Sequence, residues 1–167
     1  RSSSSQPILQ NFPVRDQEIG DLIRRCFIPR KGRVLVEIDY GSIEVRAAAW
    51  YHQDPTMLAY IADPSKDMHR DMAAECYLLP QEEVDKRSRY AAKNLFVFPQ
   101  FYGDYYIHCA KNLWEAIVRL KLVNHLGVSL REHLASKGIS ELGKCDPSKR
   151  PLMGTFERHL YDVRSDV

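Results

Sequence analysis

The pattern of apolar and polar residues predicts one strand and a series of helices. Residues 33–40, RVLVEIDY, are mostly apolar and β-branched and lie between turn residues, which predicts a largely buried strand. Composition predicts helices at 42–51, 54–62, 67–79 and 80–102, and a mostly helical remainder over 104–167 with a loop at 145–151. The expected fold class is therefore α+β and predominantly helical.

Local residues indicate where some of these helices begin and end. Asp54 followed by Pro55 is typical of a helix start, and Gly103 is typical of a helix end. The predicted strand has no obvious neighbour, although its backbone groups need hydrogen-bond partners. Those partners are expected either in segments that the pattern does not predict as strands or outside these 167 residues.

Composition narrows the class of protein. The 167 residues, 44% hydrophobic and 28% charged, suit about one globular domain and exclude a chain disordered throughout. The net charge of +2 excludes a histone-like polycation but allows a local basic groove. The apolar runs are too short for a membrane-spanning helix, so no membrane partner is expected. Four widely spaced cysteines without a CxxC pair indicate reduced thiols and favour a cytoplasmic protein.

Three groups of residues carry candidate chemistry. Asp39 ends the predicted strand, where a carboxylate suits a divalent metal ion, although turn aspartates commonly serve only the local backbone. Arg89 and Lys93 lie one turn apart ahead of an aromatic stretch, and so offer cations for phosphates and rings for base stacking. The alternative is a solvated charged face. His69, near a helix start, could donate to a phosphate or make a structural hydrogen bond.

Four segments, in order over residues 1–103, resemble motifs of family A DNA polymerases, the DNA polymerase I type. They are RSSSS with LQNFP at 1–13, DYGSIEVR at 39–46 (motif A), DMH at 67–69, and RYAAK with FYG at 89–103 (motif B). The phrase FVFPQFYG at 96–103 favours a bacteriophage-type branch, and hence the host cytoplasm. The resemblance implies a partial palm at 1–53 and helical fingers at 54–167, with the nucleotide-binding helix at 80–102.

The resemblance also implies a mechanism and roles for its residues. A primer 3′-hydroxyl attacks the α-phosphorus of a deoxynucleoside triphosphate with the help of two Mg²⁺ ions. Asp39 is expected to be one of two ligand aspartates, and the Tyr40 carbonyl is expected to be a further ligand. Arg89 and Lys93 are expected to neutralise the triphosphate, assisted by His69.

Other positions are expected to select the sugar and hold DNA. The resemblance implies that Glu44 bonds to Tyr102 and blocks a ribose 2′-hydroxyl, whereas by composition alone Glu44 is a surface helix residue. It also places five residues at the primer–template DNA, the first three of them along the minor groove, where base acceptors report base-pair geometry without sequence. These residues are Arg1, Gln10, Asn11, Tyr102 and Gly103.

The sequence departs from the family pattern within motif B. The spacing from Lys93 to Tyr102 is nine residues, one more than is usual. A π-bulge would absorb the extra residue and keep Phe98 on the Lys93 face as the nucleotide-stacking ring, and Pro99 removes an amide donor nearby. In the alternative register, Val97 adjoins the sugar and Phe101 takes the place of the tyrosine.

A second departure concerns motif C. No HDE-like triplet with a second catalytic aspartate occurs in the 167 residues. We therefore expect a fragment that is inactive alone and needs the remainder of a polymerase, namely the thumb and the motif C part of the palm. The alternative is a non-catalytic module, derived from the same fold, that binds nucleic acid or nucleotides.

Overall fold

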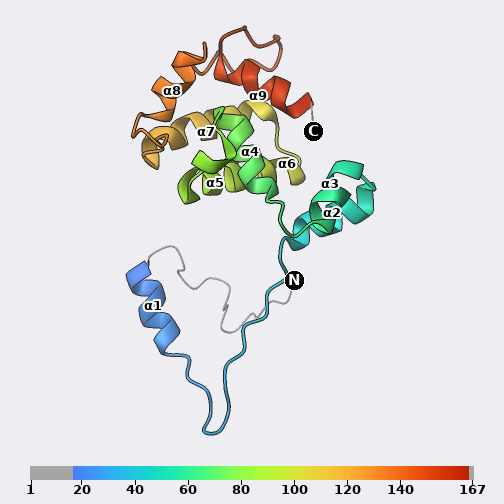
Figure 1. Ribbon diagram of the computed structural model, residues 1–167, viewed down its shortest axis with the longest axis vertical. Coiled ribbons are helices and arrows are strands. Elements are labelled where there is room, and N and C mark those ends of the chain that lie inside the picture. The colour runs from blue at the N-terminus through green and yellow to red at the C-terminus, as the bar shows by residue number, and fades with distance from the viewer. Residues whose placement is uncertain (1–16, 166–167) are drawn as a thin grey trace. The chain divides into compact units, whose positions relative to one another are not determined.

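The computed structural model describes residues 17–165 and divides into two units after Gly41 (Figure 1). In the first unit, α1 (Gln17–Arg25) is followed by an extended segment that includes residues 33–40. In the second unit, most of the described residues lie in helices, which confirms the predominantly helical class. The expected palm–fingers boundary after residue 53 stays a prediction.

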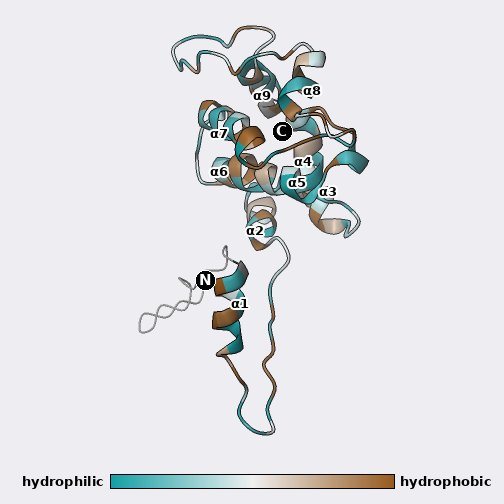
Figure 2. Ribbon diagram, turned by 90° about the vertical axis from the view of Figure 1, so that its left-hand side faces the viewer, coloured by the Kyte–Doolittle hydropathy of each residue, from teal (hydrophilic) through white to brown (hydrophobic). Residues whose placement is uncertain are grey.

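The predicted strand at 33–40 is wrong for the described chain. These residues pair with no strand in the described part, and Val34 and Ile38 are 80% and 84% exposed. Figure 2 shows hydrophobic residues along this extended segment. The composition favours a strand, but a strand forms only when a neighbour accepts and donates its ladder hydrogen bonds. Among the described residues, β-pairing is limited to isolated bridges, Val123 with Ser129 and Glu141 with Thr155.

Two short helices open the second unit. The predicted helices at 42–51 and 54–62 are confirmed as α2 (Ile43–His52) and α3 (Pro55–Ala62), which pack against each other. The Asp54 carboxylate caps α3 by accepting from the Met57 amide at 2.7 Å. The N-cap aspartate followed by proline therefore sets this helix start, as predicted.

The segment predicted as one helix at 80–102 is built from several pieces. A 3₁₀ turn, η2 (Gln81–Glu83), precedes α5 (Lys86–Ala92), so a helix start at Pro80 is wrong. Asp85 caps α5 instead, because its carboxylate accepts from the Ser88 amide at 2.7 Å. The chain continues through a π-helical turn, η3 (Lys93–Val97), into α6 (Phe98–Phe101). The predicted π-bulge is confirmed.

The remaining helices complete the second unit. They are α4 (Met68–Tyr77), α7 (Tyr106–Arg119), α8 (Leu130–Ser136) and α9 (Phe156–Ser165). The loop predicted at 145–151 lies between α8 and α9, as expected. No helix in the described ranges is both long and apolar enough to cross a membrane.

Helices α4 to α9 share one core (Figure 1). Phe156 of α9 is fully buried, stacks on Tyr77 of α4 at 6.3 Å between ring centroids, and lies 5.3 Å from the Trp114 ring of α7. Phe96 and Val97 of the π turn enter the same core. The C-terminal helix therefore helps to fix α4 and the π turn, which carry the charged residues described next.

Candidate functional site

A hollow on the second unit is lined by basic residues and two neutral polar residues of α4, α5 and η3. The lining residues are Arg70, Lys86, Arg89, Tyr90, Lys93 and Asn94. Four of the six side chains carry a positive charge and none carries a negative charge. Arg89 and Lys93 lie one turn apart, as the sequence predicted. Such a hollow attracts a polyanion and offers it several charge-assisted hydrogen bonds.

Arg89 is held in place by an ion pair with Asp67. Its Nε lies 2.7 Å from one carboxylate oxygen of Asp67, and its Nη2 lies 3.1 Å from the other. Asp67 also caps α4, because its side chain accepts from the amides of His69 and Arg70. Partial burial by itself would raise the pKa of Asp67, but the bonds from Arg89 and Arg70 outweigh it and lower that pKa.

The π turn brings Phe98 beside Lys93. The Lys93 Nζ lies 5.1 Å from the centroid of the Phe98 ring, and His69 approaches the same ring edge-on at 5.7 Å. Val97 is only 7% exposed and packs in the core. Phe98, which is partly exposed, therefore shares a face with Lys93, whereas Val97 does not; the nucleotide-stacking role of Phe98 stays a prediction.

His69 is a buried neighbour of the two cations. Its side chain is 5% exposed, and its Nδ1 has no hydrogen-bond partner among residues 17–165. Burial lowers the pKa of His69, the charges of Lys93 and Arg89 lower it further, and Asp67 opposes them. The imidazole is therefore neutral near pH 7.

Glu44 and Tyr102, expected to bond to each other, lie in the second unit without that bond. Glu44 is in the first turn of α2 and is half-buried, whereas Tyr102 follows α6 and is 79% exposed. No hydrogen bond joins the two in the described structure. Gly103 has φ +83°, a conformation that favours glycine, and ends the helix as predicted.

The expected metal ligands belong to the first unit. Asp39 and Tyr40 are exposed in the extended segment of the first unit. Their carboxylate and carbonyl oxygens are of the type that Mg²⁺ prefers, but no three His, Cys, Asp or Glu residues within 17–165 are grouped to hold a metal ion. The described residues therefore do not form a two-metal centre by themselves. Arg1, Gln10 and Asn11 fall outside the described residues.

Sequence reasoning did not assign to the site four of the residues that line the hollow, Arg70, Lys86, Tyr90 and Asn94, nor the partner of Arg89, Asp67. Arg70 lines the hollow, and Asp67 holds Arg89 from 22 positions away in the chain. Arg70 directly follows DMH, so a helix start at Asp67 would have placed it in the first turn. The pairing of Asp67 with Arg89 has no sequence signal, because it depends on how α4 packs on α5.

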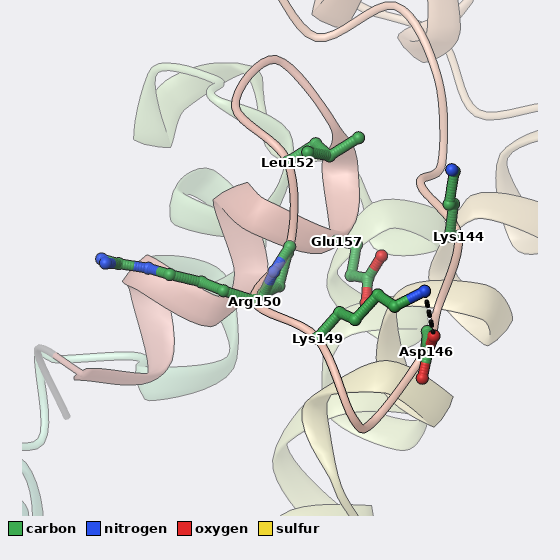
Figure 3. Close-up of a pocket in the computed structure, with 7 residues that line it drawn as sticks. Lys144, Asp146, Lys149, Arg150, Leu152 and Glu157 are labelled. Atoms are coloured by element: carbon green, nitrogen blue, oxygen red, sulfur yellow. Dashed lines mark ion pairs between the residues drawn. The ribbon is translucent and has the colours of Figure 1, made fainter.

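A second hollow, between the 144–152 loop and α9, has mixed charge (Figure 3). Lys149 pairs with Asp146 at 3.5 Å, and the buried Glu157 accepts from the Cys145 amide at 2.8 Å. Two carboxylates among three cations leave little attraction for a polyanion. The α4–α5 hollow is the stronger candidate.

Known proteins match most of the chain. The family model for DNA polymerase family A matches residues 1–118. The thermostable DNA polymerase I of Thermus aquaticus is 40% identical over 95 residues, which are 57% of this chain and 11% of that protein. DNA polymerase I of Caldicellulosiruptor bescii is 38% identical over 93 residues, 56% of this chain and 11% of that protein. The chain thus spans about a tenth of the length of these curated relatives.

We predict that replacing Lys93 with Met raises the pKa of His69, because the substitution removes a nearby positive charge. NMR titration of the His69 ring measures this pKa. The control is Lys111→Met on the exposed face of α7, which should leave it unchanged. An unchanged His69 pKa in Lys93→Met would contradict the geometry.

The lowered pKa of His69 also predicts how the free energy of unfolding depends on pH. The folded pKa of His69 lies below the unfolded value of about 6.5. The contribution of neutral His69 to the free energy of unfolding is therefore fully present above about pH 6.5. It is lost as the pH falls through the pKa of His69 in the folded state.

Proposed function

The chain belongs to DNA polymerase family A, and on that premise we propose that its α4–α5 hollow binds the triphosphate of an incoming deoxynucleotide. One observation carries the proposal: four cations and no carboxylate surround one hollow, and the Phe98 ring lies beside Lys93. A deoxynucleoside triphosphate combines both chemistries, because its phosphates need cations and its base offers a face for stacking.

The reaction that this binding would serve is template-directed primer extension by a longer polymerase. Two Mg²⁺ ions would activate the primer hydroxyl and stabilise the leaving pyrophosphate. Asp39 and the Tyr40 carbonyl would supply ligands, and a second aspartate would have to come from outside these 167 residues. By itself the chain is then expected to bind nucleotides without extending primers.

The other site residues are proposed for selection and DNA contact. Glu44 would exclude the ribose 2′-hydroxyl beside Tyr102. Arg1, Gln10, Asn11, Tyr102 and Gly103 would face primer–template DNA. The thumb and the rest of the palm are the proposed protein partners, and the cytoplasm is the proposed location. A bacteriophage-type origin also stays a prediction.

We predict that Arg89→Ala and Lys93→Ala each weaken the binding of dNTP with Mg²⁺ to this chain. A charge-assisted hydrogen bond contributes about 1.5–3 kcal/mol, so each loss should raise the Kd roughly ten- to a hundredfold. Equilibrium titration with a fluorescent dNTP measures the effect. The matched controls Arg119→Ala and Lys111→Ala remove exposed cations of α7 and should bind like wild type. Equal Kd values for site and control variants would refute the phosphate site.

We predict that Asp39→Ala in the full-length polymerase lowers the primer-extension rate at least about a hundredfold, because a metal ligand is lost. Rapid-quench assays on a primer–template measure the rate, and Glu37→Ala, two residues away, is the control. Extension at the wild-type rate by Asp39→Ala would exclude the metal role. A full-length wild-type protein that binds dNTP but never extends a primer would instead support a non-catalytic nucleotide-binding module.

We predict that Glu44→Ala admits ribonucleotides, because the side chain that excludes the 2′-hydroxyl is gone. Discrimination, measured as the ratio of kcat/KM for dNTP and rNTP, should fall about tenfold to a hundredfold in the full-length polymerase. Glu115→Ala, an exposed glutamate of α7, serves as the control. Retained discrimination in Glu44→Ala would remove Glu44 from sugar selection.

A further inference from the structure

We propose that Asp67 is a positioning residue for Arg89: it orients the guanidinium so that the unoccupied edge of that group can bind phosphate oxygens. This inference rests on the proposed function of the hollow and adds a residue to it. Asp67 does not line the hollow, and its proposed effect on the ligand passes through Arg89, which does line it.

The geometry divides the guanidinium into a held edge and a free edge. The Asp67 carboxylate accepts a bidentate pair of hydrogen bonds from the Nε and Nη2 of Arg89, at 2.7 and 3.1 Å. A guanidinium has five N–H bonds in a planar fork. The Arg89 N–H bonds that do not point to Asp67 have no hydrogen-bond partner within 17–165. The Arg89 side chain, which lines the hollow, is 36% exposed. A phosphate can therefore bind Arg89 without displacing Asp67.

The carboxylate that holds Arg89 is itself fixed. One Asp67 oxygen accepts from the amides of His69 at 3.1 Å and Arg70 at 3.2 Å, at the first turn of α4. The positive end of the helix dipole favours a carboxylate there. Because α4 packs on α5, the fixed Asp67 carboxylate holds the plane of the Arg89 guanidinium in one orientation.

Electrostatics gives a reason for this arrangement. Arg70, Arg89 and Lys93 would repel one another, and an arginine side chain held by nothing samples many rotamers. One carboxylate placed behind Arg89 offsets part of the repulsion and fixes one rotamer before the nucleotide arrives. Preorganisation of this kind favours affinity because less freedom is lost on binding.

The test separates this role from capping. Asp67→Asn keeps an N-cap side chain of equal capping strength and removes the negative charge. The matched control is Asp54→Asn, which makes the same change at the cap of α3, where the carboxylate accepts from the Met57 amide. Binding of dNTP with Mg²⁺ is measured for wild type, both Asn variants, Arg89→Ala and Asp67→Asn/Arg89→Ala. Thermal unfolding of each variant is measured alongside.

The expected result is a coupling between Asp67 and Arg89. Asp67→Asn should remain folded at the temperature of the binding assay and raise the Kd about fivefold or more, because Arg89 is less preorganised. Asp54→Asn should not change the Kd. In the Arg89→Ala background, Asp67→Asn should add nothing, because the residue through which it acts is gone. In the full-length polymerase, the same variant should raise KM for dNTP more than it lowers kcat.

Three results would overturn the inference. An unchanged Kd in Asp67→Asn would leave Asp67 as a helix cap alone. A lower Kd would show that Asp67 competes with phosphate for Arg89. An equal rise in Kd on Asp67→Asn in the wild-type and Arg89→Ala backgrounds would show that Asp67 does not act through Arg89. Failure of Arg89→Ala to weaken binding would instead contradict the proposed function of the hollow, so the two failures are distinguishable.

Discussion

The π turn at Lys93–Val97 is the constraint on which the candidate site depends. Pro99 has no amide to continue the regular α-helical ladder, and the Phe98 amide bonds to the Lys93 carbonyl five residues back. The extra residue in the turn lets the chain bury two side chains in the core and also keep Phe98 on the Lys93 face. Phe96 and Val97 enter the core, while the Phe98 ring stays beside Lys93, which lines the hollow. A regular helix of the same length would turn one of these groups away.

The core keeps this turn in place from the opposite side. Phe156 of α9 packs against Tyr77 and Trp114, so the C-terminal helix supports α4 and α7 behind the charged face. The family match ends at residue 118, before α9 begins. The C-terminal part of the chain therefore contributes to the candidate site through packing, although it lies outside the matched region.

The charge around the hollow differs from the net charge of the whole chain. The net charge is +2, yet four cations line one hollow, and Asp67 pairs with one of them, Arg89. His69 is buried, and burial together with the charges of Lys93 and Arg89 lowers its pKa, so it adds no further positive charge near pH 7. A cationic face can thus persist on a nearly neutral chain because opposite charges are placed behind it or elsewhere on the surface.

The sequence by itself determined the features that depend on near neighbours. The cap at Asp54 and the helix end at Gly103 follow from interactions within about one turn of the chain, whereas the π turn before Pro99 was predicted from the extra residue relative to the family's motif B spacing. The motif order likewise identified the family. Tertiary structure decided the rest: the ion pair of Asp67 with Arg89, the burial of His69 and the place of Arg70 in the hollow. These depend on the packing of α4 against α5, which no local pattern encodes. Residues 33–40 show the same limit, because strand composition produces a sheet only where a neighbouring strand completes its hydrogen bonds.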